Sequence, residues 1–371
     1  MKRVIEQEFV QKIFRQYYLE NVSKIKPPSS ISKREFGAIL FHEKMMIRHR
    51  AFKTAEELQS FITSVSPSDI YYSSAYYEYP ENAMDKKKWL GADLIFDIDS
   101  DHIQTPCKKS HDYWICENCG NIAAIGEKPA RCVKCGGAKF KTEGWICDIC
   151  LDAAKNETQK LLDFLIFDFG FKEETITVCF SGQRGYHVHI EDPNIQNLDQ
   201  NSRKEIADYI TGTGLKLEFH GLIQRNDVKK RTILLPELNS PGWGGRIMRG
   251  IYDVLGEVSV DTMSELGFSK KTAKLIQKKR EEILDSISEG KKTVSRDLKI
   301  EYLIKLAEDG IRRQASAIDT VVTTDIHRLI RLPETLHGKT GLKAIEIPLN
   351  SLEKFDPLKD SLAFRTGAVK V

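Results

Sequence analysis

Two aspartates separated by one residue stand in an otherwise apolar run of the sequence. In Leu94–Asp99 the apolar side chains alternate with Asp97 and Asp99, which predicts a β-strand with both carboxylates on one face. Two acids this close repel each other unless a cation neutralises them. Mg²⁺ and Mn²⁺ prefer oxygen ligands, and two such ions about 4 Å apart can align the oxygens of a phosphoryl transfer. The pair therefore suggests a divalent metal site, although a solvent-exposed strand face with two acids has the same pattern.

A glycine-containing segment, Ser181–His189, supplies groups that suit a phosphate ligand. Its two glycines allow the backbone to approach a phosphate closely, and Arg184 can donate two hydrogen bonds to phosphate oxygens. His187 and His189 share one face of the strand predicted over 186–190. Taken alone, the segment also fits an ordinary glycine turn with a surface arginine.

A third segment, Asp319–Gly341, offers acids first and cations afterwards. Asp319 and Asp325 are followed by arginines, by histidines, and by Lys339–Thr340 between two glycines. Acids for metal ions, together with arginine, histidine and lysine for a triphosphate, are the groups that nucleotidyl transfer requires. The segment therefore favours phosphoryl chemistry at the same site.

Seven of the eight cysteines lie between Cys107 and Cys150, and six of those form three CxxC pairs. In a sequence without a recognisable export signal, this clustering predicts metal ligation rather than disulfides. Four inner ligands have zinc-ribbon spacing, namely Cys116, Cys119, Cys132 and Cys135. Four outer ligands are Cys107, His111, Cys147 and Cys150. Cys179 lies in an apolar strand and is predicted to be a buried thiol.

Two pairings of these eight ligands are consistent with their spacing. A nested pairing places the ribbon inside the outer site. It is favoured because Cys147 and Cys150 lack the glycine that follows both ribbon pairs and run directly into a predicted helix. A sequential pairing would assign the first four ligands to one ion and the last four to the other. In either case four protein ligands leave no open position, so two structural Zn²⁺ ions are expected.

Three segments together resemble the catalytic small subunit of archaeal and eukaryotic DNA primases. They are FDIDSD (96–101), SGQRGYHVHI (181–190) and IDTVVTTDIHRLIRLPETLHGKTG (318–341). The resemblance extends to REFGAILFHEKMMIRHRAF (34–52) and WICDICLDAAKNETQKLLDFLIFDFGF (145–171). It runs from about residue 10 to residue 345 and is weakest over 195–310. No single motif is decisive, but their order and combination are highly specific.

The resemblance implies roles for the residues at matching positions. Asp97, Asp99 and Asp319 match the catalytic acids of the family, which hold Mg²⁺ or Mn²⁺, and Asp325 is the rival third acid. The positions that match nucleotide-binding side chains are Ser181, Arg184, His187, Arg331 and His337.

Weaker matches lie around this set. Glu35 and Arg48 match positions at the mouth of the site, whereas His189, His327 and Arg328 also fit a structural role. The outer cysteine set resembles the zinc knuckle of the family, and the inner ribbon looks like an addition to that pattern.

The function implied by the resemblance is template-directed primer synthesis for DNA replication. The 3′ oxygen of one nucleotide attacks the α-phosphate of a nucleoside triphosphate, and pyrophosphate leaves. The implied partners are a primase large subunit in a heterodimer, a single-stranded DNA template and nucleoside triphosphates, with no membrane. The alternatives are a repair or end-joining polymerase of the same superfamily and a non-catalytic zinc-ribbon adaptor for nucleic acids. The adaptor would not need the acids and the phosphate-binding residues together.

The expected fold that positions these residues is α+β. Mixed sheets would form a primase catalytic core, with a zinc-binding insertion and a helical subdomain. The expected parts are 1–106 and 151–195 (catalytic core), 107–150 (zinc-binding insertion, knuckle plus ribbon), 196–310 (mostly helical subdomain) and 311–371 (return to the core).

Local patterns predict the individual elements. Helices are expected over 1–25, 54–64 and 151–170, and a β-hairpin is expected over 34–52. Near the end, AIDTVVTT (317–324) predicts β-structure, followed by a short helix and by a strand in LKAIEIPL (342–349). Lysines cluster over 270–279, but Glu281, Glu282 and Asp285 follow, and mixed signs predict a solvated face.

The composition of the 371 residues fits a globular protein, with 41% hydrophobic and 29% charged residues. A net charge of +3 is too small to indicate a nucleic-acid partner by itself, so such a partner would need a local patch. No apolar run approaches the roughly 18 residues of a membrane helix. A cytoplasmic protein is therefore expected.

Overall fold

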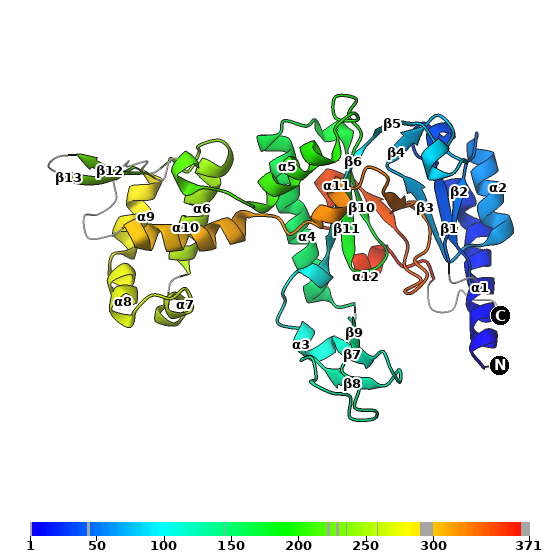
Figure 1. Ribbon diagram of the computed structural model, residues 1–371, viewed down its shortest axis with the longest axis horizontal. Helices are drawn as coiled ribbons and strands as arrows, with labels where there is room; N and C mark the ends of the chain where they lie inside the picture. The colour runs from blue at the N-terminus through cyan, green and yellow to red at the C-terminus, as the bar shows by residue number, and fades with distance from the viewer. Residues whose placement is uncertain are drawn as a thin grey trace. The chain divides into compact units, whose positions relative to one another are not determined.

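The computed structural model of the protein describes residues 2–42, 45–144, 146–220, 223–227, 230–234, 236–257, 259–289 and 300–364. The chain divides into two compact units. The first unit comprises residues 1–159, 172–205 and 317–371, and the second comprises 160–171 and 206–316. Helices and antiparallel strands occur in both, so the fold is α+β (Figure 1).

The first unit contains a four-stranded antiparallel sheet with strand order β14–β3–β1–β2. Its strands are β1 (Phe36–Ile39), β2 (Ile47–Arg50), β3 (Asp69–Ser73) and β14 (Leu329–Arg331). Helices α1 (Lys2–Asn21) and α2 (Ala55–Val65) share an apolar cluster with this sheet. Tyr18, Leu58 and Ile70 are fully buried within it. The hairpin predicted over 34–52 and the helix predicted over 54–64 are thus confirmed.

A second four-stranded antiparallel sheet has the order β15–β10–β11–β6. Its strands are β6 (Leu94–Asp99), β10 (Ile176–Phe180), β11 (Gly185–Ile190) and β15 (Ile345–Ile347). Leu94, Phe96 and Ile98 are completely buried on one face of β6. Because strand side chains alternate, Asp97 and Asp99 project from the opposite face, as predicted.

Smaller elements complete the first unit. Strands β4 (Ala75–Tyr77) and β5 (Trp89–Ala92) form a two-stranded sheet. The cysteine-rich region begins with the short helix α3 (Lys108–His111). It continues as a three-stranded sheet of β7 (Tyr113–Cys116), β8 (Ile122–Ile125) and β9 (Phe140–Glu143), with β7 in the centre. Helix α4 (Asp148–Asp163) follows, and a π-helical turn, Phe164–Asp168, extends it.

The second unit is mainly helical. Helix α5 (Gln200–Thr211) ends within it, and its remaining helices are α6 (Gly242–Gly256), α7 (Val260–Glu265), α8 (Lys270–Lys278), α9 (Arg280–Ser288) and α10 (Ile300–Gln314). Helices α6 and α10 cross at Gly250 and Gly310, where a Cβ atom on Gly250 would lie 2.5 Å from the Cα of Gly310. Only glycine permits this approach.

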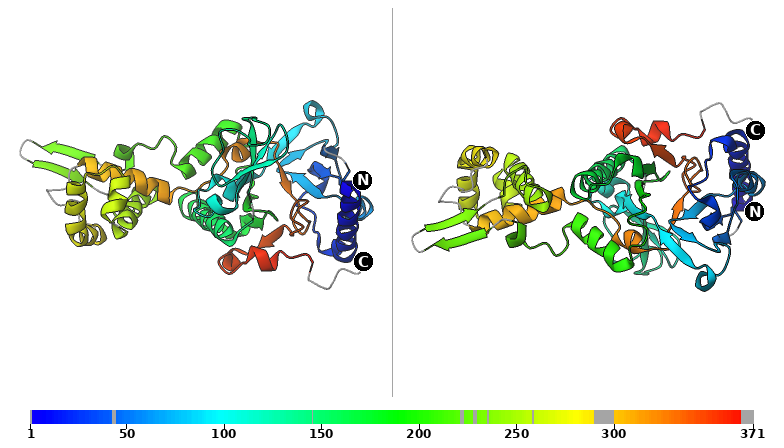
Figure 2. Two further views of the ribbon diagram at one scale, coloured as in Figure 1. Left: turned by 90° about the horizontal axis from the view of Figure 1, so that it is seen from below. Right: turned by 90° about the horizontal axis from the view of Figure 1, so that it is seen from above.

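One part of the second unit was not expected from the sequence. Strands β12 (Ile223–Asp227) and β13 (Lys230–Leu234) pair as an antiparallel hairpin within the region predicted to be mostly helical (Figures 1 and 2). The run Thr232–Leu234 is β-branched and aliphatic, which favours a strand. Because charged residues precede this run, its strand pattern was not recognised in the sequence.

The prediction for AIDTVVTT was wrong. Residues Thr320–Thr324 form helix α11, and the short helix expected after them is instead strand β14. Asp319 is the N-cap of α11, and its carboxylate accepts hydrogen bonds from the N–H groups of Val321 and Val322. This cap favours a helical turn over the β-propensity of valine and threonine.

Across the described residues, none of the helices combines the length and apolarity needed to cross a membrane.

Candidate active site and metal centres

The two neighbouring aspartates lie beside the predicted phosphate-binding strand. In the pairing of β6 with β11, Asp97 stands opposite His187 and Asp99 stands opposite Gly185. The Oδ1 atom of Asp97 is 3.6 Å from Nε2 of His187. A Cβ atom on Gly185 would collide with the carbonyl oxygen of Ile98, so this close register requires glycine.

Asp319 joins this pair from a distant part of the chain. Its N–H group donates a 2.8 Å hydrogen bond to the carbonyl of Asp97, which sets the start of α11 against β6. The pKa of Asp97 is raised from 3.8 to about 6, mainly by burial, then by the charge of Asp99, with a smaller contribution from Asp319. The three acids are therefore close enough to repel one another. Asp325 follows the other end of α11, where its carboxylate accepts from the N–H of His327.

The three aspartates are not yet arranged as metal ligands. Among the described residues, three sets of potential ligands have atoms within 4.8 Å of one another, and Asp97, Asp99 and Asp319 are not one of them. One carboxylate oxygen of Asp319 is directed to the backbone of α11 instead. Mutual repulsion of three carboxylates favours such separation.

A cavity of about 280 Å³ unites the acids with cationic and polar groups. Its wall is formed by Asp97 and Asp99 with four of the five predicted nucleotide-binding residues, namely Ser181, His187, Arg331 and His337. Gln183 and Arg328 also contribute to it. Segments far apart in the sequence thus meet around one small volume.

Arg331 is held rigidly at this cavity. Strand β14 pairs with β3 so that Arg331 stands opposite Tyr71, and its guanidinium donates to the Tyr71 hydroxyl over 2.9 Å. Its Nη1 atom donates to Asp69 over 2.7 Å. Burial alone would raise the pKa of Asp69, but Arg331 and the N–H of Gly338 lower it, so this carboxylate stays charged.

The two histidines of the cavity are neutral near pH 7. Burial lowers the pKa of His187 and of His337 to about 3, and the charge of Arg331 adds to both shifts. Their rings can therefore donate or accept hydrogen bonds without adding positive charge.

Arg184 lies in a neighbouring cavity of about 650 Å³ rather than in the wall of the first one. Its guanidinium forms an ion pair with Asp101, two residues after Asp99. Gln183 contributes to both cavities, so the spaces adjoin at this turn. Here Gly182 has a φ of +80°, which favours glycine, and the Ser181 hydroxyl accepts from the N–H of Gly185.

Sequence reasoning assigned some roles that the structure does not support directly and missed others. Glu35 and Arg48 pair with each other at 2.9 Å and do not form part of the acidic cavity. Arg328 does contribute to its wall and lowers the pKa of Asp97 against the other influences. The position of Arg328, three residues before Arg331, could have indicated from the sequence that it contributes to the site. No sequence pattern marked Asp69 or Asp101, the acids that pair with Arg331 and Arg184.

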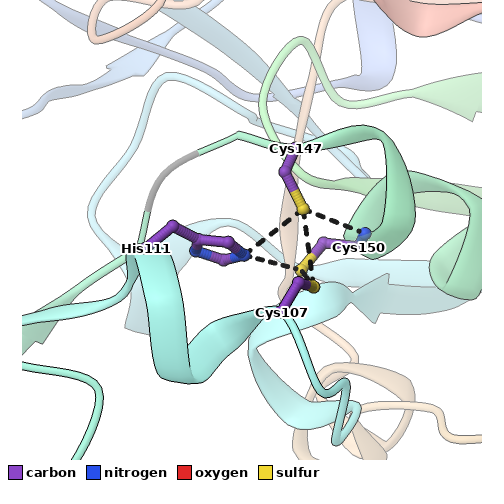
Figure 3. A group of neighbouring side chains, drawn as sticks. All are labelled: Cys107, His111, Cys147 and Cys150. Atoms are coloured by element: carbon purple, nitrogen blue, oxygen red, sulfur yellow. Dashed lines mark hydrogen bonds between the residues drawn. The ribbon is translucent and has the colours of Figure 1, made fainter.

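The eight metal-binding candidates form two groups of four. Cys107, His111, Cys147 and Cys150 converge in one group, with Nε2 of His111 at 3.3 Å from the Cys147 sulfur (Figure 3). The ribbon cysteines Cys116, Cys119, Cys132 and Cys135 converge in the other. This is the nested grouping, and the sequential sets do not come together among the described residues.

Their geometry fits Zn²⁺. Sulfur–sulfur separations are 3.4 Å between Cys107 and Cys150 and 3.7 Å between Cys119 and Cys132. A tetrahedral site with Zn–S bonds of about 2.3 Å requires about 3.8 Å. Nδ1 of His111 lies 2.8 Å from the Asp112 carboxylate but does not form a hydrogen bond with it. Cys179 is buried as predicted, and burial raises its thiol pKa.

The chain is similar to known proteins over most of its length. The family model for the DNA primase small subunit matches residues 141–349. The sequence is 35% identical to the "DNA primase small subunit PriS" of Methanococcoides burtonii over 380 aligned residues, covering 98% of this chain and 87% of the relative. It is 36% identical to the protein of that name from Methanothrix thermoacetophila, covering 96% and 87% of the two chains. The Nitrosopumilus maritimus protein of the same name is 31% identical, covering 98% and 87%.

Proposed function

Because this chain belongs to the DNA primase small subunit family, we propose that its acidic cavity is the primer-synthesis site. The family membership makes the protein a DNA-directed nucleotidyltransferase of replication. The observation that carries the assignment of the site is the cavity itself. It brings two acids of β6, with Asp319 close by, against the cations and histidines of two distant segments.

In the proposed mechanism Asp97, Asp99 and Asp319 hold two Mg²⁺ or Mn²⁺ ions. Such ions would stabilise both the attacking 3′ oxygen and the leaving pyrophosphate of an in-line displacement. The raised pKa of Asp97 supports the proposal, since a carboxylate cluster that is costly to charge has a strong affinity for cations. Asp319 would hold an ion with the carboxylate oxygen that does not cap α11.

The residues of the opposite wall would position the triphosphate. Arg331 is fixed by Asp69 and Tyr71, so it presents its charge without losing side-chain freedom on binding. The neutral rings of His187 and His337 would donate hydrogen bonds to phosphate oxygens. Arg184 would reach the outer phosphates from the adjoining cavity after exchanging Asp101 for phosphate.

We further propose that the two cysteine groups hold structural Zn²⁺ ions. Each supplies four protein ligands at tetrahedral separation, which leaves no position for a substrate. A small subunit implies a large-subunit partner, together with DNA and nucleotide substrates. We propose that the pair forms a heterodimer in the cytoplasm.

The test is primer synthesis by the full chain on a single-stranded DNA template, with and without divalent metal. Ribonucleotides and deoxyribonucleotides are supplied in separate reactions. Metal-dependent synthesis that stops with chelator is expected. Synthesis unaffected by chelation would contradict the metal assignment, and no synthesis under any condition would favour the adaptor. A strong preference for gapped or broken duplexes would favour a repair polymerase.

A further inference from the structure

In a helical hairpin of the second unit, the second helix carries four lysines and no acid. Helices α7 and α8 are joined by a tight turn in which Gly267 has a φ of +76°. Met263 and Phe268, on either side of the turn, are buried and anchor it. The turn is therefore anchored by apolar side chains, and the polar side chains of α8 lie on its exposed side.

The lysines of this region and the acids that follow them lie on two different helices. From Leu266 to Arg280 the chain contains six cations and no acid. The acids that follow, Glu281, Glu282 and Asp285, belong to a separate helix, α9, because α8 ends at Lys278. The lysines are exposed, as expected for a solvated face, but the acids lie in another helix, so the charged side chains of α8 are all cationic.

Four of its lysines lie on a single face, which we call the lysine stripe: Lys270, Lys271, Lys274 and Lys278. At about 100° per residue they fall within an arc of about 100°. The fully buried Ala273 and Ile276 lie on the opposite side of the helix. All four stripe lysines are exposed, and none forms an ion pair with another described residue.

Another cation lies at the turn itself. The Nζ atom of Lys305, from α10, donates to the carbonyl of Gly267 over 2.9 Å and stands over the ring of Phe268. The hairpin thus gathers charges from two helices. Side chains at 270, 274 and 278 rise about 6 Å from one to the next along the helix. Regularly spaced, uncompensated cations are complementary to a regularly charged polyanion.

We propose that the lysine stripe binds the phosphodiester backbone of DNA. This inference rests on the proposed function, which supplies a DNA strand as a substrate. Lysine binds phosphate as a point charge and does not read base identity, so binding through the stripe would be independent of sequence. Its contribution would be to hold the template strand on the enzyme outside the chemical step.

The test compares full-length variants for binding of a labelled single-stranded DNA and of a duplex of equal length, over a range of salt concentrations. In the stripe variant, Lys270, Lys271, Lys274 and Lys278 are replaced by glutamine, which preserves helix propensity. The charge-matched control replaces four exposed lysines of the first unit by glutamine, namely Lys12, Lys33, Lys53 and Lys354. A third variant carries arginine at all four stripe positions and keeps the charge.

The stripe variant is expected to bind single-stranded DNA at least about tenfold more weakly at low salt. Its plot of log affinity against log salt should be shallower by about 0.7 for each phosphate that the variant no longer neutralises, or about 3 in total. The lysine control and the arginine variant should bind like the unmodified chain. Whichever of the single strand and the duplex shows the larger drop in affinity is the form that the stripe holds.

Unchanged affinity and salt dependence in the stripe variant would overturn the proposal. It would also be overturned if the variant kept its DNA affinity but no longer associated with the large subunit, since the stripe would then be a protein-docking surface. Primer synthesis at saturating template is measured in parallel and should be unaffected. Loss of DNA binding in a chain that synthesises nothing would leave this inference standing while the proposed function fails.

Discussion

Two clusters of acids and histidines lie on the second sheet or directly beside it. They differ in how the charges of their acids are compensated. In the first, Asp97 stands beside His187 with Asp99 nearby, and the pKa of Asp97 is raised to about 6. In the second, Asp93 receives a 2.7 Å ion pair from Arg34 and a 2.9 Å contact from His189. There the pKa of Asp93 is lowered, because these partners outweigh its burial.

The cluster around Asp93 is structural, whereas the cluster around Asp97 is the candidate functional one. Residue types are nearly the same, and Asp93, His189 and Glu191 even have ligand atoms within 4.8 Å of one another. Yet Arg34 already neutralises Asp93 from within the protein, while the charge of Arg328 only partly offsets the raised pKa of Asp97, which borders an open cavity. An acid that the fold itself does not neutralise is the one that can take a metal ion.

The largest effect is expected at the uncompensated cluster. Replacing Asp97 or Asp99 by Asn should reduce primer synthesis by more than about 100-fold, because a metal ligand is removed. The unfolding free energy should stay constant or rise, since one repelling charge is removed. Synthesis and urea denaturation are measured on the same preparations. Near-normal synthesis by either variant would remove the basis for the metal assignment.

At the compensated cluster around Asp93, we expect a large loss of stability and little change in activity. Replacing Arg34 by Met leaves Asp93 charged and buried, which should reduce the unfolding free energy by about 3–5 kcal/mol. The folded fraction should retain its turnover per molecule, measured by active-site titration with substrate. A stable but inactive Arg34→Met variant would show that the two clusters are not distinct in role.

The two clusters should also differ in their response to acid. The lowered pKa of Asp93 means that its stabilising contribution is present above its ordinary value of 3.8 and is lost as pH falls through the folded-state value. The stability difference between the unmodified chain and Asp93→Asn should therefore be constant near neutrality and shrink below about pH 4. Denaturation series at several pH values measure it. A difference that grows on acidification would contradict this assignment.

Arg184 is an intermediate case and should give the smallest effect. The charge of Arg184 is compensated by Asp101, but this carboxylate is partly exposed and can release the arginine. Asp101→Asn should lower the nucleotide KM by about two- to fivefold with little change in kcat, because an exposed pair contributes at most about 1 kcal/mol. Steady-state kinetics of the variant measures whether the nucleotide KM falls or rises. A raised KM would mean that Asp101 positions the arginine rather than competing with phosphate.

The sequence alone was sufficient to predict features that depend on local pattern. Alternation in 94–99 predicted the strand and its acidic face, and ligand spacing predicted both cysteine groups. Prediction from the sequence failed where a single side chain determined the conformation of the backbone. The Asp319 cap turned AIDTVVTT into a helix, and no propensity scale registers that bond. Long-range partners were also inaccessible, since the Asp69–Arg331 pair joins residues more than 250 positions apart.

The central claim is that Asp97, Asp99 and Asp319 share divalent ions, and calorimetric titration with Mn²⁺ tests it most directly. Measurements compare the unmodified chain with Asp319→Asn and with Asp325→Asn, whose acid lies at the other end of the same short helix. Mn²⁺ affinity should fall at least about tenfold in Asp319→Asn and stay unchanged in Asp325→Asn. Normal binding by Asp319→Asn, with binding abolished in Asp325→Asn, would contradict the account.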